Sequence, residues 1–145
     1  YEVTKYTEQR VYKNTKKNIK KFVADKFNSQ SELLFGIFFK KKHVGNIKLG
    51  QINKHHLSAD LSYILGEKKF WNQGIITKSI KLVKEFAFQR LLLKKITSSC
   101  YENNIGSIKV LKKNDFCLEG VLKKQIVFEN ERVNTIKFGI SSENE

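Results

Sequence analysis

Proline and methionine are absent from this chain of 145 residues, and arginine is scarce. Of the 28 basic residues only Arg10, Arg90 and Arg132 are arginines, and with 14 acidic residues the net charge is +14. A protein that reads base sequence is expected to use arginine, because the guanidinium group makes bidentate contacts with base edges. The lysine-rich composition therefore does not indicate dedicated nucleic-acid binding. A basic surface would still attract ribosomes, acidic peptides or the phosphates of a cofactor.

Cysteine is also scarce, and its pattern argues against a metal site. Cys100 and Cys117 stand at no metal-ligand spacing, and no Cys-x-x-Cys occurs. We predict that both are buried free thiols in a reducing compartment. His43, His55 and His56 fall in predicted loop tips with no carboxylate or cysteine at ligand spacing, so no metal is expected.

Long hydrophobic runs are missing as well. No stretch approaches the length and apolarity of a membrane span, and the first residues do not resemble a signal peptide. We therefore expect a soluble, cytoplasmic protein with no membrane partner. Because the chain begins at Tyr1 and holds no methionine, we expect that residues at its start are omitted. No repeat or low-complexity linker interrupts the chain, and its length suits a single domain over residues 1–145.

What the chain does contain is a clear alternation of helical and extended patterns. The lysine-rich region from Thr7 to Phe27 has apolar residues at helical spacing and fits one or two helices. Three strands joined by tight turns follow, then a long amphipathic helix, another apolar strand, a second amphipathic helix and two final strands. The predicted ranges are Leu33–Phe39, Val44–Gln51, Ala59–Gly66, Gly74–Arg90, Lys95–Tyr101, Asn104–Lys113 and, around a turn at Glu129–Glu131, Phe116–Ile140.

The segment Phe70–Thr77 joins the third strand to the long helix and is suited to hold a phosphate. A glycine at this helix start, Gly74, lets the backbone approach a ligand closely. The N–H groups of the first turn have no partners within the helix and carry the positive end of its dipole, so a pyrophosphate would satisfy them. The alternative interpretation is that Gly74 only starts a helix.

Three segments follow one another along the chain and are informative together: Trp71–Ile76, Asn104–Phe116 and Leu118–Leu122. They resemble the acetyl-CoA loop, in the variant that begins with Trp, the Asn-x-x-Ser helix and the following strand of the GNAT acetyltransferases. Within that superfamily the match is to the RimJ/RimL-type N-acetyltransferases, and it covers about Gly45 to Ile140. The resemblance implies an α/β protein with the GNAT fold, in which helices flank a mixed, mostly antiparallel central sheet.

The chain departs from the family pattern in three places. Ile76 replaces a small residue of the loop and would crowd it, and Asp115 stands where glycine is usual. In such enzymes a first strand and part of a helix precede the segment that resembles Val3–Tyr6. We expect those elements to be missing from this sequence.

The resemblance implies transfer of an acetyl group from acetyl-CoA to a primary amine by direct attack in a ternary complex, without a covalent enzyme intermediate or a metal. It places the developing oxyanion near the backbone N–H of Tyr63 or Ile64. The residues it assigns to binding acetyl-CoA are Tyr63, Ile64, Leu65, Trp71, Asn72, Gln73, Gly74, Ile75, Ile76, Thr77, Asn104 and Ser107.

Proton transfer needs further residues, because a protonated amine cannot attack until a base or a water chain takes its proton. The resemblance makes Asp60 the first candidate for that base and Glu102 the second, although either could be only a solvated carboxylate. Ser107 is the candidate acid, since the tyrosine used by other relatives falls at Leu111 here. Ser107 could instead orient the cofactor, and Asn104 could simply be a helix N-cap.

The acceptor stays open at this point. Tyr6 and Tyr12 are predicted to line its pocket, because early helices build that pocket in similar enzymes. A RimJ/RimL-like match suggests a protein N-terminus, often ribosomal, so ribosome association is open, but the subgroup also includes enzymes that modify amino sugars, polyamines and antibiotics. The alternatives are a nucleotide-linked amino-sugar acetyltransferase of surface-glycan synthesis, and a non-catalytic module that binds acyl-CoA or nucleic acid. The pattern allows a monomer or a homodimer.

Overall fold

The computed structural model describes residues 2–12 and 15–142 of the chain. Its elements, in order, are the 3-10 helix η1 (Glu8–Val11), α1 (Lys16–Phe27), β1 (Leu33–Phe39), β2 (Lys42–Asn53), β3 (Ser58–Leu65), the 3-10 helix η2 (Lys68–Phe70), α2 (Ile75–Gln89), β4 (Lys95–Tyr101), α3 (Ile105–Lys112), β5 (Cys117–Phe128) and β6 (Glu131–Ser141). The predicted strands and helices are confirmed to within about two residues at each end. Residues 13 and 14, which the first predicted helical region also covered, lie outside the described residues.

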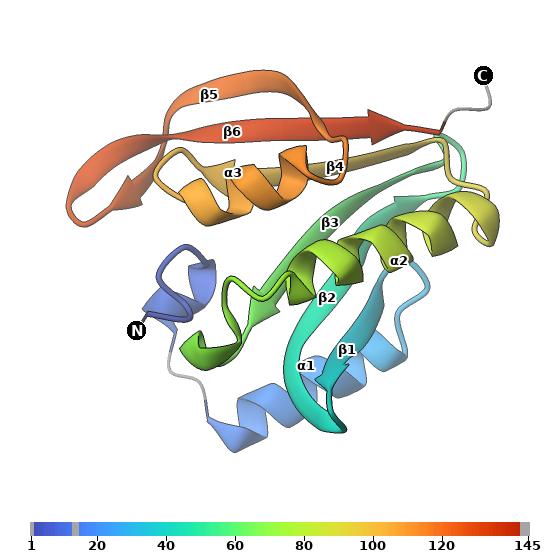
Figure 1. The fold of residues 1–145 in the computed structure, drawn as a ribbon, viewed down its shortest axis with the longest axis horizontal. Helices are drawn as coiled ribbons and strands as arrows, with labels where there is room; N and C mark the ends of the chain where they lie inside the picture. The colour runs from blue at the N-terminus through green and yellow to red at the C-terminus, as the bar shows by residue number, and fades with distance from the viewer. Residues whose placement is uncertain (1, 13–14, 143–145) are drawn as a thin grey trace.

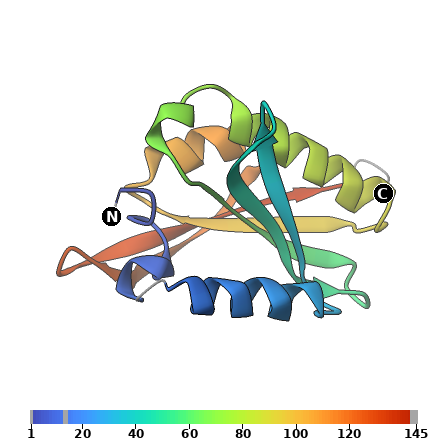
Figure 2. The ribbon, with the colours of Figure 1, turned by 90° about the horizontal axis from the view of Figure 1, so that it is seen from below.

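Among the described residues, six strands form one twisted sheet in the order β1-β2-β3-β4-β6-β5. The pairs β1–β2, β2–β3, β4–β6 and β5–β6 are antiparallel, and only β3–β4 is parallel. Helix α1 lies on one face of the sheet, and α2 and α3 lie on the other (Figures 1 and 2). The mixed, mostly antiparallel sheet flanked by helices is therefore confirmed.

The core lies between the sheet and the helices α2 and α3. Helix α2 buries Ile80, Val83 and Ala87, which recur at three- and four-residue steps and so share one face. Each large apolar side chain that is removed from water there contributes about 1.5–3 kcal/mol. The largest fully buried side chains are Ile47, Leu49, Leu61, Ile80, Ile96, Leu111 and Phe138.

The central pair of strands separates soon after it starts. Strands β3 and β4 are in register only from Ser58 opposite Lys95 to Asp60 opposite Thr97. Beyond that point β3 stays with β2 up to Leu65, while β4 stays with β6 up to Tyr101. The two strands therefore diverge and leave an opening in the middle of the sheet.

The two cysteines and Asp115, all singled out in the sequence, differ in their surroundings. The prediction that both cysteines are buried is wrong for Cys117, which is exposed at the start of the edge strand β5, whereas Cys100 is buried on the central strand β4. Asp115 has φ of 68°, the left-handed region that favours glycine but that aspartate tolerates. The turn after α3 thus keeps its shape without the usual glycine.

Among the described residues, no helix has the length and apolarity to cross a membrane.

Candidate active site

A cavity of about 800 Å³ lies where β3 and β4 separate. Its walls come from the N-terminal segment 2–8, the end of β3, the loop before α2, the end of β4 and one side of α3. This volume lies within the range of about 300–1,000 Å³ that is usual for sites of small molecules and cofactors. The fold therefore places a ligand-sized cavity at the strand separation.

The predicted donor-binding residues gather at this cavity. All of them line it except Gln73, whose side-chain amide instead donates to the Lys69 carbonyl oxygen at 2.5 Å. Tyr6 lines the cavity as well, whereas Tyr12 does not and is largely exposed. The placement brings distant segments together, and the role of each residue stays a prediction.

The loop before α2 has the backbone shape that an anion site needs. Gly74 is the N-cap of α2 with φ of 73°, in the left-handed region, and a Cβ there would meet no atom within 4 Å. Glycine is therefore favoured at position 74 by the positive φ of the backbone and not by a lack of space for a side chain. The helix's first backbone bond runs from the Lys78 N–H to the Gly74 carbonyl at 3.0 Å, so the N–H groups of residues 75–77 have no partner within the helix.

Side chains of the loop tie it to its neighbours. The Trp71 indole N–H donates to the Leu65 carbonyl oxygen at 3.3 Å, which holds the loop against the end of β3. Ile76, which lies in the first turn of α2, is partly buried, packs against the main core and also lines the cavity. The loop is therefore held against the sheet by the Trp71 hydrogen bond and by apolar contacts such as that of Phe70 with Phe39.

Two hydroxyl groups meet at the cavity, one from α3 and one from β3. The Asn104 side chain accepts a hydrogen bond from the Ser107 N–H at 3.1 Å, so Asn104 is an N-cap, as one interpretation of the sequence held. The Ser107 Oγ and the Tyr63 hydroxyl oxygen are 2.5 Å apart and share a hydrogen bond. Burial raises the pKa of Tyr63 to about 12, although the bond with Ser107 opposes the shift. Burial likewise raises the pKa of Cys100 to about 11.

The two carboxylates proposed as bases lie elsewhere. Asp60 is not among the cavity-lining residues; its Oδ1 accepts a hydrogen bond from the Thr97 hydroxyl at 3.1 Å, at the last pair before the strands part. Glu102 also lies off the lining, and its two oxygens accept from the backbone N–H and the side-chain amide of Asn134, at 2.7 and 2.8 Å. The Glu102 carboxylate thus has a structural role, because it holds Asn134. A role in proton transfer stays a prediction for both Asp60 and Glu102.

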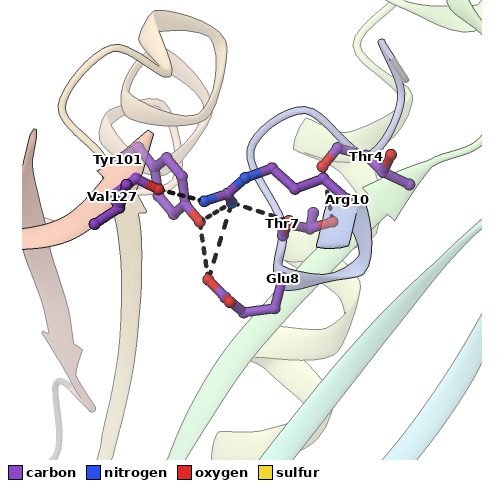
Figure 3. A network of polar contacts seen from close by, with 6 residues as sticks. All are labelled: Thr4, Thr7, Glu8, Arg10, Tyr101 and Val127. Carbon is purple, nitrogen blue, oxygen red and sulfur yellow. Dashed lines mark hydrogen bonds and ion pairs between the residues drawn. The ribbon is translucent and has the colours of Figure 1, made fainter. Parts of the chain in front are cut away.

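Sequence reasoning missed a carboxylate that does line the cavity, Glu8 (Figure 3). Its Oε1 accepts a hydrogen bond from the Tyr101 hydroxyl at 2.9 Å, and Arg10 donates to the same hydroxyl oxygen. The two partners Glu8 and Tyr101 are 93 residues apart in the chain. No local spacing could have revealed the pair, because it depends on how the N-terminal segment packs on β4.

Charge is unevenly spread around the cavity. The acidic residues of the lining, Glu2 and Glu8, belong to the N-terminal segment, and the lysines of the lining, Lys109 and Lys113, belong to α3 and its end. Together with the unbonded N–H groups at the start of α2, those lysines make one side of the cavity suitable for phosphate groups. The residues present therefore fit a phosphate-bearing donor such as acetyl-CoA. Within residues 2–12 and 15–142, no group of three His, Cys, Asp or Glu could hold a metal ion.

Comparison with known proteins gives the family to which this fold and cavity belong. Residues 1–117 match the family described as acetyltransferase (GNAT) domain. The chain is a member of the GNAT acetyltransferase family, as its loop and its Asn-x-x-Ser helix had indicated.

Relatives and similar structures agree with this membership. The chain is 32% identical over 119 residues to the protein named "Probable N-acetyltransferase YjcK" of Bacillus subtilis (strain 168), which covers 77% of this chain and 65% of that protein. It is 26% identical over 113 residues to spermidine N(1)-acetyltransferase of Escherichia coli (strain K12), over 78% of this chain and 60% of that protein. The chain thus spans less than two thirds of the length of either relative.

Two solved structures have the same fold. RimL, the ribosomal L7/L12 alpha-N-protein acetyltransferase in complex with coenzyme A, matches with a TM-score of 0.90 at 18% identity, over 98% of this chain and 81% of that one. Spermidine N-acetyltransferase from Vibrio cholerae, in complex with CoA and spermine, matches with a TM-score of 0.85 at 18% identity, over 97% of this chain and 82% of that one. At this identity the likeness concerns the fold alone.

Proposed function

We propose that the protein is an acetyl-CoA-dependent N-acetyltransferase that moves an acetyl group to a primary amine by direct attack in a ternary complex. The observation that carries the proposal is the cavity at the separation of β3 and β4, because it joins the Gly74 loop to the exposed backbone of β3. The names of similar proteins support an amine acceptor, since they include acetyltransferases for a ribosomal protein N-terminus and for spermidine.

The chain's own residues divide the task between two sides of the cavity. Backbone N–H groups at the start of α2, with Lys109 and Lys113, would hold the phosphates of the donor, which supplies a thioester-activated acetyl group when bound. The N–H group of Tyr63 or Ile64, on the part of β3 that has left β4, would stabilise the negative charge that develops on the carbonyl oxygen. Positioning both reactants in one cavity supplies much of the acceleration.

We propose that the hydroxyl pair returns a proton to the departing thiolate. Ser107 would donate that proton, as the sequence suggested, and would take a proton back from solvent, while Tyr63 shares a hydrogen bond with it. A phenol with a pKa of about 12 stays protonated at neutral pH, so it can keep the Ser107 hydroxyl oriented. Asp60, Glu102 or a water chain would take the proton of the amine.

The test is a calorimetric titration of acetyl-CoA into the protein, with CoA and ATP as controls. We expect saturable one-to-one binding of acetyl-CoA and CoA and much weaker binding of ATP. The variant Gly74→Pro should lose this binding, because proline cannot adopt a positive φ and lacks the N–H. Far-ultraviolet circular dichroism would confirm that the variant is folded. A folded Gly74→Pro variant that binds acetyl-CoA normally would contradict the assignment of the loop.

Charge on α3 offers a matched pair of variants. Lys109 lines the cavity and Lys112, on the same helix, does not. Lys109→Ala should weaken acetyl-CoA binding severalfold, whereas Lys112→Ala removes the same charge and should change it by less than about twofold. Binding without turnover on any amine would favour the non-catalytic acyl-CoA module. Acetyl-CoA-independent binding of nucleic acid, steeply weakened by salt, would favour the nucleic-acid module.

A further inference from the structure

The N-terminal segment carries a carboxylate that is held in place although it is largely exposed. Glu8 begins η1, and 69% of its side chain is accessible. A glutamate in such a place would normally sample many rotamers, but its Oε1 is bonded to the hydroxyl of Tyr101, which is buried. Among the residues that the structure describes, no donor is bonded to the second oxygen, Oε2. The carboxylate of this cavity-lining residue is oriented, and its second oxygen can still accept a hydrogen bond.

Arg10 builds the platform on which Glu8 and Tyr101 lie (Figure 3). Its guanidinium donates to the Val127 carbonyl at 2.6 Å, to the Thr7 carbonyl at 3.2 Å and to the Tyr101 hydroxyl. It approaches the Glu8 carboxylate only to 4.0 Å, the outer limit of an ion pair. Arg10 therefore offsets part of the negative charge of Glu8 while its donors point at other oxygen atoms.

Aromatic rings surround the same point. Tyr6 stacks on Phe128 with ring centroids 5.3 Å apart and meets Tyr101 edge-on at 6.0 Å. Phe128 and Tyr101 are buried in a small cluster that is separate from the main core. Tyr6 and Tyr101 also line the cavity beside the carboxylate, and cations of the chain itself already lie over their rings, Lys5 Nζ at 5.5 Å from the Tyr6 centroid and Arg10 Cζ at 5.2 Å from the Tyr101 centroid. That combination suits an ammonium group on an alkyl chain.

The charge of this end is unusual for the molecule. In a chain with a net charge of +14, the acidic residues of the cavity lining are Glu2 and Glu8, both in the N-terminal segment, and Arg10 approaches Glu8 only to 4.0 Å. Glu2 is paired with Lys68 at 3.2 Å, but both side chains are more than half exposed, so water and salt weaken that pair. These carboxylates would repel an acceptor that carries phosphates close to its amine. They would attract a cationic aliphatic amine.

The geometry points to Glu8 as the residue that receives the protonated amine of the acceptor, and to an aliphatic amine with more than one positive charge as the acceptor class. This inference rests on the proposed acetyltransferase function and adds to it a specificity-determining residue. It separates the acceptors left open by the sequence, because a nucleotide-linked amino sugar carries negative charge where the cavity wall is acidic.

The experiment measures binding without any acetyl donor, by following the fluorescence of Trp71, the single tryptophan, which lines the cavity. The probes are 1,4-diaminobutane as a dication, 1,4-butanediol as its neutral counterpart, and uridine-diphosphate glucosamine as an anionic amino sugar. We expect the diamine to bind and the other two to bind at least about tenfold more weakly, since a charge-assisted hydrogen bond contributes about 1.5–3 kcal/mol. Binding of the diol or the amino sugar as tightly as the diamine would overturn the inference.

Two variants with the same change of charge make the test specific. Glu8→Gln should weaken diamine binding about tenfold at low salt, and the difference should shrink as salt screens the carboxylate. Asp25→Asn, on the exposed surface of α1, should leave diamine binding within about twofold, because it alters net charge alone. Equal diamine binding by Glu8→Gln and the parent would overturn the assignment.

Acetyl-CoA titration of the same samples separates this inference from the proposed function. If the parent binds acetyl-CoA but not the diamine, the acceptor assignment fails and the acetyltransferase proposal stands. If a short peptide with a free N-terminus binds more tightly than the diamine, and Glu8→Gln does not weaken it, the acceptor is a protein N-terminus and the inference is wrong.

Discussion

Asp60 is a half-buried carboxylate whose surroundings act against its ionised form. Burial raises the pKa of Asp60, while the hydrogen bond from Thr97 and the charges of Lys137 and Lys48 oppose the shift. Because the pKa is higher in the folded than in the unfolded protein, folded Asp60 binds more protons between the two values. The contribution of Asp60 to the free energy of unfolding therefore falls as pH rises from the ordinary pKa of the carboxyl through the raised one.

We accordingly expect Asp60→Asn to be more stable than the parent at pH 7, because the amide carries no charge and its oxygen can still accept from Thr97. The advantage should shrink as pH falls below the ordinary pKa of aspartate, where the parent is protonated too. Urea unfolding at pH 7 and at about pH 3.5, on either side of that window, measures both effects. Asp25→Asn is the exposed control and should show little difference at either pH.

If Asp60→Asn is no more stable than the parent at pH 7, that result would contradict a raised pKa of Asp60 in the folded protein. The same variant also tests the role of Asp60 as the base. An unchanged rate and pH dependence of acetylation would dismiss that role, which is the outcome its position outside the cavity lining favours.

At the scale of elements, the separation of β3 and β4 depends on contacts at its closed end. The Ser98 hydroxyl donates to the Leu61 carbonyl at 2.8 Å, one residue beyond the last paired position, and this bond is buried. It joins the two strands at the point where their backbone pairing stops. It therefore holds the strands together at the start of the opening.

Ser98→Ala should therefore lower the free energy of unfolding by about 0.5–1.5 kcal/mol, the usual net contribution of one hydrogen bond. Ser99→Ala, at the neighbouring exposed position of β4, should lower it less. Denaturant unfolding of both variants gives the comparison, and a larger loss for Ser99→Ala would contradict the assigned role of Ser98.

The elements are also where sequence reasoning succeeded most clearly. Alternating and 3.6-residue patterns located every described strand and both helices on the core side, α2 and α3, because burial of one face dictates those periods. The Gly74 loop and the Asn104 cap were found for the same reason, since each is set by a few adjacent residues. Contacts between distant segments leave no such pattern. The placement of Glu8 beside Tyr101 and the engagement of Glu102 by Asn134 could be seen only in the fold.

At the scale of the whole molecule, the excess of 28 basic over 14 acidic residues should make the protein sensitive to salt. Like charges repel in the compact state, and salt screens that repulsion. Exposed ion pairs such as Lys68–Glu2 and Lys42–Glu67 contribute little, so their weakening should not offset the gain.

We therefore expect the urea midpoint to rise when sodium chloride is increased from about 0.05 to 0.5 M, which shortens the screening length severalfold. Chloride is preferable to sulfate here, because sulfate also strengthens apolar burial. A midpoint that falls with chloride would mean that the ion pairs outweigh the repulsion between lysines.

The contacts of residues 2–8 have an evolutionary consequence. This short stretch forms one wall of the cavity, yet among the described residues it meets the sheet through side chains such as Tyr6 on Phe128 rather than through backbone pairing with a strand. Substitutions there can reshape what the wall accepts without disturbing the strands or the loop before α2. Lineages sharing this architecture could diverge in their choice of amine by altering fewer than ten residues, while the machinery for the common donor is inherited intact.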